Sequence, residues 1–455
     1  MYQNVPDPKA VKAVPPAPSL GEAFWYWLKL GFVSFGGPAG QIAMMHAELV
    51  ERRRWISEQR FLHALNYCML LPGPEATQLA VYIGWLLHRT RGGILAGVLF
   101  VLPSLLILLA LSYIYLAFGS LPAVAGVLYG MKPAVVAIVL AAAWRIGRRT
   151  LRNRTLQCIA MAAFVAISLL HLPFPAIVLG AAVAGWLGGR LAPAQFQAGG
   201  GAQASQAGYG PALIDDHSPT PQHARFSWLR LARNAAAGLA LMLGAWLLLA
   251  WLTGAQRPLA QMGWLFTKTA MLTFGGAYAA LPYIYQHAVA GFHWLTPAQM
   301  IDGLALGETT PGPLIMVVAF VGFVAAWSQD VLGGNLAAAG MAGAAVAAWF
   351  TFLPSFIFIL AGGPLVEAMR GNIRMTAPLT AISAAVVGVI ASLALFFGQH
   401  VFITPAGVDW LGAALAAAAL LALLRLKTGP VKVLAACAIA GGVLSYPGYM
   451  NFLHQ

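Results

Sequence analysis

The chain has 455 residues, of which 60% are hydrophobic and 9% are charged. This composition leaves too little polar surface to cover a soluble globule of that size, so it excludes a soluble protein. The formal net charge of +13 could suggest nucleic acid, but the basic residues fall mostly in short loops between apolar runs, as orientation signals do. We therefore expect an all-α polytopic membrane protein that lies in a lipid bilayer and has no nucleic-acid partner.

The N-terminal residues 1–20 contain Lys9, Lys12 and several prolines, but no apolar core followed by a small-residue cleavage site. The sequence thus predicts no cleaved signal peptide. Apolar runs such as 92–117 and 123–144 exceed the roughly 20 residues that a membrane crossing needs. Because they lack the short alternating segments of a membrane barrel, helices are predicted.

Two apolar stretches, 62–87 and 301–327, each contain the tripeptide Pro-Gly-Pro, at 72–74 and 311–313. A helix must break there, because proline lacks a backbone donor and glycine frees the dihedral angles. Irregular backbone at membrane depth is tolerated only where protein or a water-filled cavity surrounds it. Hydropathy leaves full crossings and re-entrant hairpins open; we favour hairpins whose short half-helices meet near the midplane.

The two halves of the chain repeat each other. Phe35 and Phe274, Trp55 and Trp294, and the two Pro-Gly-Pro tripeptides share one offset of 239 residues, and later landmarks share an offset of 251. One register across such dissimilar residue types indicates an internal repeat. The expected segments are an N-terminal tail 1–20, a first transmembrane repeat 21–190, a flexible linker 191–227, an extra helix 228–253 and a second repeat 258–451. The longer helices are expected at about 92–118, 122–145, 153–170 and 173–189, and at about 333–361, 376–398, 408–425 and 431–450.

The extra helix inverts the second half if both halves cross the membrane an equal, even number of times. Arginines fill the loop at 52–54, whereas the equivalent stretch 286–299 has no Lys or Arg. Arg370 and Arg374 instead fall in a loop that an inverted half places in the cytoplasm. The positive-inside rule therefore predicts inverted repeats with a cytoplasmic N-terminus and linker and a C-terminus outside.

Acidic residues inside apolar segments are few. Glu75 directly follows the first Pro-Gly-Pro, and Glu308 lies three residues before the second. An intramembrane carboxylate usually faces a partner, a cavity or a proton path, so both are candidates for proton coupling. The alternative for Glu75 is an N-terminal helix cap. Asp302, Glu48 and Glu22 lie nearer the predicted helix ends and are interpreted as solvated charges.

Three lysines are candidates for anion binding. Lys29 and Lys268 occupy matched positions six residues before Phe-Gly-Gly, and Lys132 lies inside a predicted span. Inverted repeats bring equivalent residues together about a pseudo-twofold axis, where two cations would attract a divalent anion. Snorkelling to the membrane interface is the alternative, above all for Lys132.

Glycine turns at the start of half-helices add backbone donors that an anion could approach closely. Matched hydroxyls at Ser34 and Thr273 could donate to an oxyanion. The alternatives are small-residue helix packing, as for the Gly126/Gly130 spacing, and hydroxyl bonds to the local backbone. The full set of candidate anion-binding residues is Lys29, Ser34, Gly36, Gly37, Gly73, Lys132, Lys268, Thr273, Gly275, Gly276 and Gly312.

Other chemistries lack their motifs. Cys68, Cys158 and Cys437 lie in separate apolar segments without metal-ligand spacing, and the scattered histidines form no HExxH. The chain has no GxxxxGK[ST] phosphate loop for ATP hydrolysis. We expect no metal, no cofactor and no enzymatic activity.

Specific strings resemble the chromate ion transporter family in its long, two-domain form. In the first half they are Phe35-Gly36-Gly37-Pro38, Trp55-Ile56-Ser57, Leu71-Pro72-Gly73-Pro74-Glu75-Ala76 and Leu102-Pro103-Ser104; in the second they are Thr273-Phe274-Gly275-Gly276, Trp294-Leu295 and Glu308-Thr309-Thr310-Pro311-Gly312-Pro313. The second half departs from the pattern, because Ala277 replaces the proline after Gly-Gly and Leu314 replaces the acid at Glu75. These departures argue against two strictly equivalent sites.

The resemblance implies an antiporter that exports chromate across the bacterial inner membrane, driven by the proton-motive force and giving chromate resistance, with sulfate as a related anion and a periplasmic C-terminus. An anion channel or a sulfate transporter of the same architecture is the alternative. A membrane-embedded transferase would be expected to show an acidic metal site or a polar loop with several His, Asp or Glu residues, which the sequence lacks. Residue types do not distinguish chromate from sulfate, and the oligomeric state stays open, with a homodimer as one option.

Overall fold

The computed structural model describes residues 14–35, 37–196, 209–215, 218–219, 221–274, 276–368, 377–404 and 407–444. This part is all-α apart from one two-stranded antiparallel hairpin, as predicted. Its α-helices are α1 (Leu20–Val33), α2 (Gly37–His46), α3 (Glu58–Leu70), α4 (Glu75–Phe118), α5 (Pro122–Thr150), α6 (Arg154–Ser168), α7 (Phe174–Leu191), α8 (Trp228–Thr253), α9 (Pro258–Leu272), α10 (Leu281–Ile284), α11 (Pro297–Thr309), α12 (Val317–Ser328), α13 (Leu336–Ala368), α14 (Ala377–Phe402), α15 (Trp410–Leu424) and α16 (Pro430–Leu444), and the strands are β1 (Ile403–Thr404) and β2 (Gly407–Val408). Arg370 and Arg374, which entered the orientation argument, lie outside the described residues.

Six described helices are long and apolar enough to cross a membrane, which confirms a polytopic α-helical membrane protein. They are α4, α5, α7, α8, α13 and α14. The unmatched helix α8 has the bounds expected from the sequence. Most of its surface is exposed, which suits a helix that faces lipid.

The sequence signals around the Pro-Gly-Pro turns give two helices of equal length. Ser57 caps α3 by accepting from the Arg60 N–H, and Thr296 caps α11 in a capping box with Gln299. Each helix ends at its Pro-Gly-Pro turn, where proline supplies no donor. The two helices have 13 residues each and lie one repeat offset apart.

Each Pro-Gly-Pro turn is the tip of a helical hairpin. Arg60 near the start of α3 and Tyr82 in α4 both bond to Glu367, so the arms on either side of the first turn lie side by side. In the second half, the Ser328 hydroxyl at the end of α12 donates to the Trp294 carbonyl just before α11, at 3.3 Å. In each hairpin, the start of the first arm and the end of the second arm therefore lie on the same side, opposite the turn.

The helix α4 folds back on itself after its first arm. His88 and Arg89 have non-helical backbone, with Arg89 at φ +57°. The two parts of α4 then touch through glycines, because a Cβ on Gly84 would lie 2.5 Å from the Gly92 carbonyl oxygen. Gly322 and Gly343 make the equivalent contact between α12 and α13.

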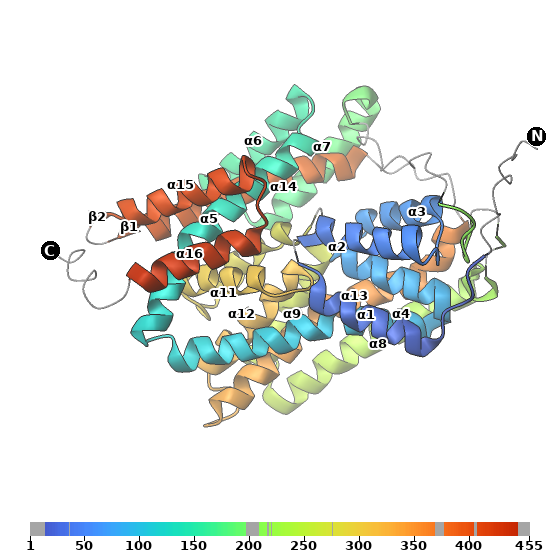
Figure 1. Cartoon of the computed structure of the whole chain (residues 1–455), viewed down its shortest axis with the longest axis horizontal. Helices are drawn as coiled ribbons and strands as arrows, with labels where there is room; N and C mark the ends of the chain where they lie inside the picture. The colour runs from blue at the N-terminus through green and yellow to red at the C-terminus, as the bar shows by residue number, and fades with distance from the viewer. Residues whose placement is uncertain are drawn as a thin grey trace, which may run out of the picture.

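The remaining long helices interlock the two halves. α5 packs against α15 and α16, and α14 packs against α6 and α7. Figure 1 shows these six helices across the upper and left parts of the molecule, with α1, α2 and α3 on the right. Gly130 of α5 sits against Gly441 of α16, where a Cβ would meet backbone within 3 Å. The small-residue interpretation of the Gly126/Gly130 spacing therefore holds.

The sequence predicts a flexible linker over residues 191–227, and the structure describes one packed segment within it. Residues 209–215 pack on the first half: the Leu213 and Ile214 N–H groups donate to the Arg54 and Trp55 carbonyls, and the Ser57 N–H donates to Ile214. Leu213 and Ile214 also pack into the first-half core. Apolar side chains in a polar, glycine-rich segment thus anchor it, and residues 197–208 lie outside the described part.

Candidate functional site

The two Pro-Gly-Pro turns bond to the ends of α1 and α9, each across to the other half. The Gly73 N–H donates to the Thr273 carbonyl and the Gly312 N–H donates to the Ser34 carbonyl, both at 2.8 Å. One repeat offset relates the two bonds. Gly73 and Gly312 have φ of +116° and +96°, which L side chains rarely adopt, so both turns require glycine. We call Ser34, Gly73, Thr273 and Gly312 the four-turn junction.

Several predicted donors are already used within the protein. The Gly73 and Gly312 N–H groups make the bonds across the junction. The Ser34 and Thr273 hydroxyls each donate to the carbonyl four residues earlier, at 2.6 Å. In this conformation both hydroxyls therefore bond to the backbone of their own helix, which was the alternative interpretation.

The Gly-Gly turns lie next to the junction. Gly36 and Gly275 lie outside the described residues. Gly37 and Gly276 have φ of +74° and +108°, and a Cβ on either would have no neighbour within 4 Å. These two glycines therefore border open space, as close approach of an anion requires.

Two glutamines of the first half bond to the Pro-Gly-Pro turns. The Gln41 amide donates to the Gly312 carbonyl at 2.5 Å, and the Gln78 amide donates to the Pro72 carbonyl at 2.7 Å. Gln78 also reaches the Ser355 hydroxyl at 3.3 Å. Each turn thus accepts a hydrogen bond from an uncharged polar side chain.

Four buried polar atoms near these turns have no hydrogen-bond partner among the described residues: Gln41 Oε1, Thr77 Oγ1, Gln78 Oε1 and Ser104 Oγ. Buried polar atoms normally have a partner, so such a cluster indicates a polar centre. The repeat counterparts of the first three are Ala280, Met316 and Val317. The polar side chains therefore come mostly from the first half, and the centre is not symmetric.

The two candidate coupling acids differ in their surroundings. Glu75 is the first residue of α4, half-buried, and makes no side-chain hydrogen bond or ion pair with another described residue. Glu308 accepts a hydrogen bond from the Tyr278 hydroxyl, and Arg145 acts on it electrostatically. Both acids are within three residues of a Pro-Gly-Pro turn, which places them beside the junction.

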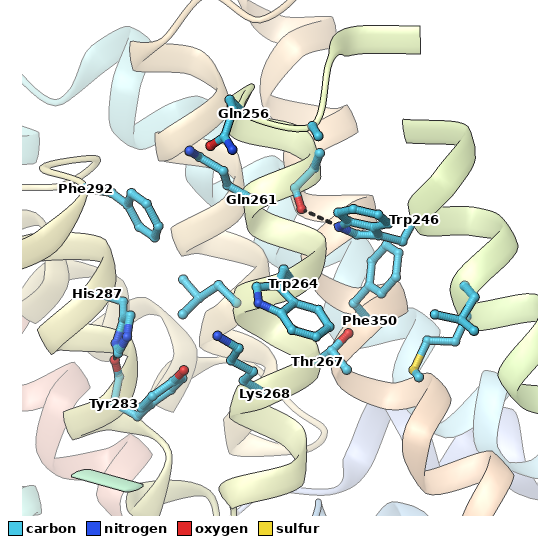
Figure 2. A pocket seen from close by; sticks show the side chains of 15 residues that line it. Trp246, Gln256, Gln261, Trp264, Thr267, Lys268, Tyr283, His287, Phe292 and Phe350 are labelled. Carbon is cyan, nitrogen blue, oxygen red and sulfur yellow. Dashed lines mark hydrogen bonds between the residues drawn. The ribbon is translucent and has the colours of Figure 1, made fainter. Parts of the chain in front are cut away.

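Lys29 and Lys268 are exposed on α1 and α9, and neither forms an ion pair with another described residue. Lys268 lines a cavity of about 570 Å³ between α8, α9, α13 and the segment 283–292. Figure 2 shows its ammonium group on the side of the cavity that faces Tyr283 and His287. The ammonium lies 4.9 Å from the centre of the Trp264 indole, and none of the lining residues is acidic.

Lys132 is paired, in contrast to the other two lysines. Its ammonium lies 3.6 Å from Asp302 Oδ2, and the Tyr115 hydroxyl donates to the same oxygen at 3.0 Å. Asp302 is buried, so its interpretation as a solvated charge was wrong. We call Tyr115, Lys132 and Asp302 the Asp302 cluster.

A second buried charged cluster lies beside the linker. Arg60 Nη1 lies 2.6 Å from Glu367 Oε2, and the Tyr82 hydroxyl donates to Oε1 at 2.6 Å. Arg60 also donates to the Asp215 and Ser218 carbonyls of the linker. We call Arg60, Tyr82 and Glu367 the Glu367 cluster.

Sequence reasoning overlooked both clusters because their members are distant in the chain. Asp302 and Lys132 are 170 positions apart in number, and Arg60 and Glu367 are 307 apart. A usable signal existed for each acid, since an intramembrane carboxylate calls for a partner. Asp302 is flanked by apolar residues of α11, and Glu367 is the single acid of α13.

These features define a class. The chain is a multi-pass membrane protein whose broken helices meet at a polar centre between two sequence repeats, an arrangement typical of secondary transporters. A sequence model of the chromate transporter family matches residues 21–186 and 260–442. The protein therefore belongs to the chromate transporter family, which is a family of transporters and not of enzymes.

Curated relatives agree over most of the chain. A chromate transport protein of Cupriavidus metallidurans is 30% identical over 447 residues, covering 97% of this chain and 98% of that protein. A chromate transport protein of Pseudomonas aeruginosa is 34% identical over 394 residues, covering 85% and 83%. A probable chromate transport protein of Synechococcus elongatus is 29% identical over 396 residues, covering 87% and 88%. No solved structure matches.

Proposed function

We propose that this protein is a secondary active antiporter that exports chromate from the cytoplasm in exchange for protons and so gives chromate resistance. The observation that carries the proposal is the four-turn junction, because two hydrogen bonds across the repeat join broken helices at a polar centre. A carrier site between repeats can be exposed to either side when one part of the protein rocks against the other. Sulfate, another tetrahedral dianion, would fit the same site.

The anion site that we propose lies at the junction. The open space beside Gly37 and Gly276, the turns at Gly73 and Gly312 and the unpaired polar atoms of the first half support this placement. Lys29 and Lys268 would attract the anion along the approach on each side. Glu75 and Glu308, next to the turns, would carry protons.

The driving force is favourable in this direction. Moving a dianion out of a cell that is negative inside releases roughly 4.6 kcal/mol per 100 mV, because two charges cross the field. Entering protons would add to this force. Glu75 suits the proton path because it has no described bonding partner.

We further propose a bacterial inner membrane location with the linker in the cytoplasm and the C-terminus in the periplasm. The arginines at 52–54 and 145–154 support it, because the linker packs beside the first of these groups. An impermeant thiol reagent applied outside should label a cysteine placed at Gly407 and miss one placed at Arg152. Labelling of both positions from one face would contradict the orientation.

Transport in sealed inverted membrane vesicles tests the function. Radiolabelled chromate should accumulate above its equilibrium level when a proton gradient is imposed, and unlabelled sulfate should compete if both anions share the site. Simple equilibration under every gradient would show an anion channel instead. Empty-vector vesicles and molybdate or phosphate as competitors serve as controls.

A further inference from the structure

We propose that the cavity between α8, α9 and α13 binds an anionic phospholipid, with the phosphate beside Lys268 and one acyl chain along α8. The site lies outside the transport reaction, although a bound lipid would compete with the transported anion for Lys268. The cavity volume of about 570 Å³ is within the roughly 300–1,000 Å³ of sites that bind small organic ligands. As in such sites, the lining is mostly apolar and contains a few polar groups.

The cavity has a polar side and an apolar side, which meet at the Trp264 indole. Figure 2 shows the polar groups of Lys268, Tyr283 and His287 on one side of this indole, and the rings of Trp246 and Phe350 on the other. Met242 and Leu243, one turn before Trp246 on α8, add to the apolar lining. A ligand with a charged head and a hydrocarbon chain matches both sides, whereas a small dianion matches only the first.

No acidic side chain of the cavity balances the charge of Lys268. None of the lining residues is acidic, and the sequence has no Asp or Glu between positions 217 and 301. Arg257, next to the lining residue Gln256, adds a second positive charge. Because the surroundings are mostly apolar, an unshared ammonium there attracts an anion more strongly than it does in water. The head of the ligand is therefore expected to be anionic.

The position of the cavity along α8 matches one leaflet of a bilayer. Met242 lies near the middle of this helix of 26 residues, and the lining continues to Ala255 and Gln256, just beyond its end. Half of such a helix spans about 20 Å, compared with about 15 Å for half of the hydrocarbon core. Gln256 therefore lies at the level of lipid headgroups, and the apolar lining lies at the level of acyl chains.

Lys268 extends toward the headgroup level. It lies ten positions after Pro258, the first residue of α9, but its ammonium is 4.9 Å from the centre of the Trp264 ring, one turn nearer that end. Helical side chains lean toward the start of their helix, and the flexible lysine stem can extend further. The ammonium can thus meet a phosphate at the inner edge of the headgroup layer.

The cavity is preformed and open to the membrane. The Trp246 indole N–H donates to the Ala260 carbonyl at 3.0 Å, which holds α8 against α9. On α13, Ile357 packs against Gly238 of α8. Most of the surface of α8 is exposed, and the Trp264 side chain between the two sides of the cavity is more than half exposed. A lipid can therefore enter sideways from the bilayer.

The repeat provides a control position in the same chain. Lys29 and Trp25 are the first-half counterparts of Lys268 and Trp264, and both are exposed. Among the described residues, α1 is the first helix, so nothing there corresponds to α8. The same pair of side chains thus occurs once with the cavity and once without it.

Lipid titration followed by native mass spectrometry tests the site. The full-length protein, purified in detergent and freed of lipid, is titrated with dioleoyl phosphatidylglycerol, or with dioleoyl phosphatidylcholine, which has the same chains but no net charge. We expect one phosphatidylglycerol to bind more tightly than any phosphatidylcholine. Lys268→Gln should weaken that binding about fivefold, the effect of one basic residue beside an anionic lipid, and Lys268→Arg should keep it.

Matched variants locate the lipid. Lys29→Gln removes the same charge where the cavity is missing, so phosphatidylglycerol binding should stay unchanged. Leu243→Trp keeps the charge but fills the apolar side of the cavity, and it should weaken the binding of phosphatidylglycerol. Melting temperatures show whether each variant is folded. If Lys268→Gln does not fold, Leu243→Trp decides, because unchanged lipid binding in this variant would overturn the site.

Three further results would count against the proposal. Equal losses in Lys268→Gln and Lys29→Gln would show that binding follows the net charge of the protein, and no loss in Lys268→Gln would exclude this lysine. Displacement of the lipid by an excess of sodium phosphate would assign the cavity to a free anion. The proposed function is tested separately: if the unmodified protein does not transport chromate, that function fails while the lipid site stands.

Discussion

The Glu367 cluster and the Asp302 cluster use the same kinds of side chain in opposite ways. Each joins a hairpin helix, α3 or α11, to a long helix of the other half, and each contains a carboxylate, a cation and a tyrosine. Arg60 and Glu367 are 3% and 1% exposed and meet at 2.6 Å, whereas Lys132 and Asp302 are 29% and 4% exposed and meet at 3.6 Å. A tight, fully bonded pair fixes a contact, and a loose pair can change partners.

The difference follows from the cations. Arginine is always charged and bonds in a planar fork, so Arg60 can hold Glu367 and two linker carbonyls at once. Lysine carries a compact charge on a flexible stem, which suits a pair that opens. The Glu367 cluster thus anchors the linker to the hairpin, and we infer that the Asp302 cluster is the mobile one.

The largest effect is expected from Glu367→Gln. It leaves the buried Arg60 guanidinium without its carboxylate, and breaking a buried pair in this way costs about 3–5 kcal/mol. Asp302→Asn should cost clearly less, since Lys132 reaches solvent. Thermal unfolding of the purified variants in detergent gives the comparison, and equal losses for the two substitutions would show that both clusters are structural.

The Pro-Gly-Pro turns provide the next test. Gly73→Ala should destabilise the protein by about 1–3 kcal/mol through backbone strain and stop transport, because its Cβ would lie 2.6 Å from the Ser355 hydroxyl. Gly334→Ala is the control, with φ +113° and no neighbour within 4 Å. Gly334→Ala has the same backbone strain as Gly73→Ala, but its Cβ clashes with no neighbouring atom. Transport by the Gly73 variant at the rate of this control would mean that the junction tolerates a side chain.

The tyrosines sharpen the comparison further. Tyr82→Phe removes a hydrogen bond to the buried Glu367 carboxylate, which is worth about 1.5–3 kcal/mol for a charged partner. Tyr115→Phe should lower stability less, because Asp302 Oδ2 keeps its contact with Lys132. Melting temperatures of the two purified variants test both expectations. A larger loss of stability in Tyr115→Phe would reverse the assignment of fixed and mobile clusters.

The sequence predicted those elements that depend on local signals. The extra helix α8 and the hairpin breaks at the two Pro-Gly-Pro turns follow from hydropathy and from proline chemistry, and the repeat offset related their positions. The partners of Glu367 and Lys132 did not follow, because hydrogen bonds between residues hundreds of positions apart leave no periodic pattern. The anchoring of the linker through Leu213 and Ile214 was also hidden by its polar surroundings.

The sequence predicted the asymmetry of the site only in part. Leu314 in place of an acid already argued against two equal sites. That Gln41 and Gln78 supply the polar groups at the turns needed the structure, because a glutamine in an apolar helix has no signature of its own until its neighbours are known.

The smallest expected effect concerns Glu48, which precedes helix α3 of the hairpin that carries the Glu367 cluster. Glu48 bonds to Arg53 at 2.8 Å and to Arg52 at 3.3 Å, and these guanidinium groups outweigh the effect of burial and hold the pKa of its carboxyl below the ordinary 4.5. A lowered folded pKa means that this group stabilises the protein above pH 4.5 and that the stabilisation is lost as the pH falls through the folded pKa. The repeat counterpart is His287, so the second half has no such carboxylate.

Melting temperatures of the protein and of Glu48→Gln between pH 7 and pH 3 isolate this contribution, because all other carboxylates titrate alike in both. The difference in melting temperature between the two proteins should be present at pH 7 and vanish near pH 3. It should amount to about 0.5 kcal/mol or less, because Arg52 is exposed and Arg53 is partly exposed, so solvent screens both pairs. Arg53→Gln should abolish most of the same pH-dependent difference, since its guanidinium makes the shorter bond. A Glu48 effect that persists unchanged at pH 3 would show that its side chain acts by packing and not by charge.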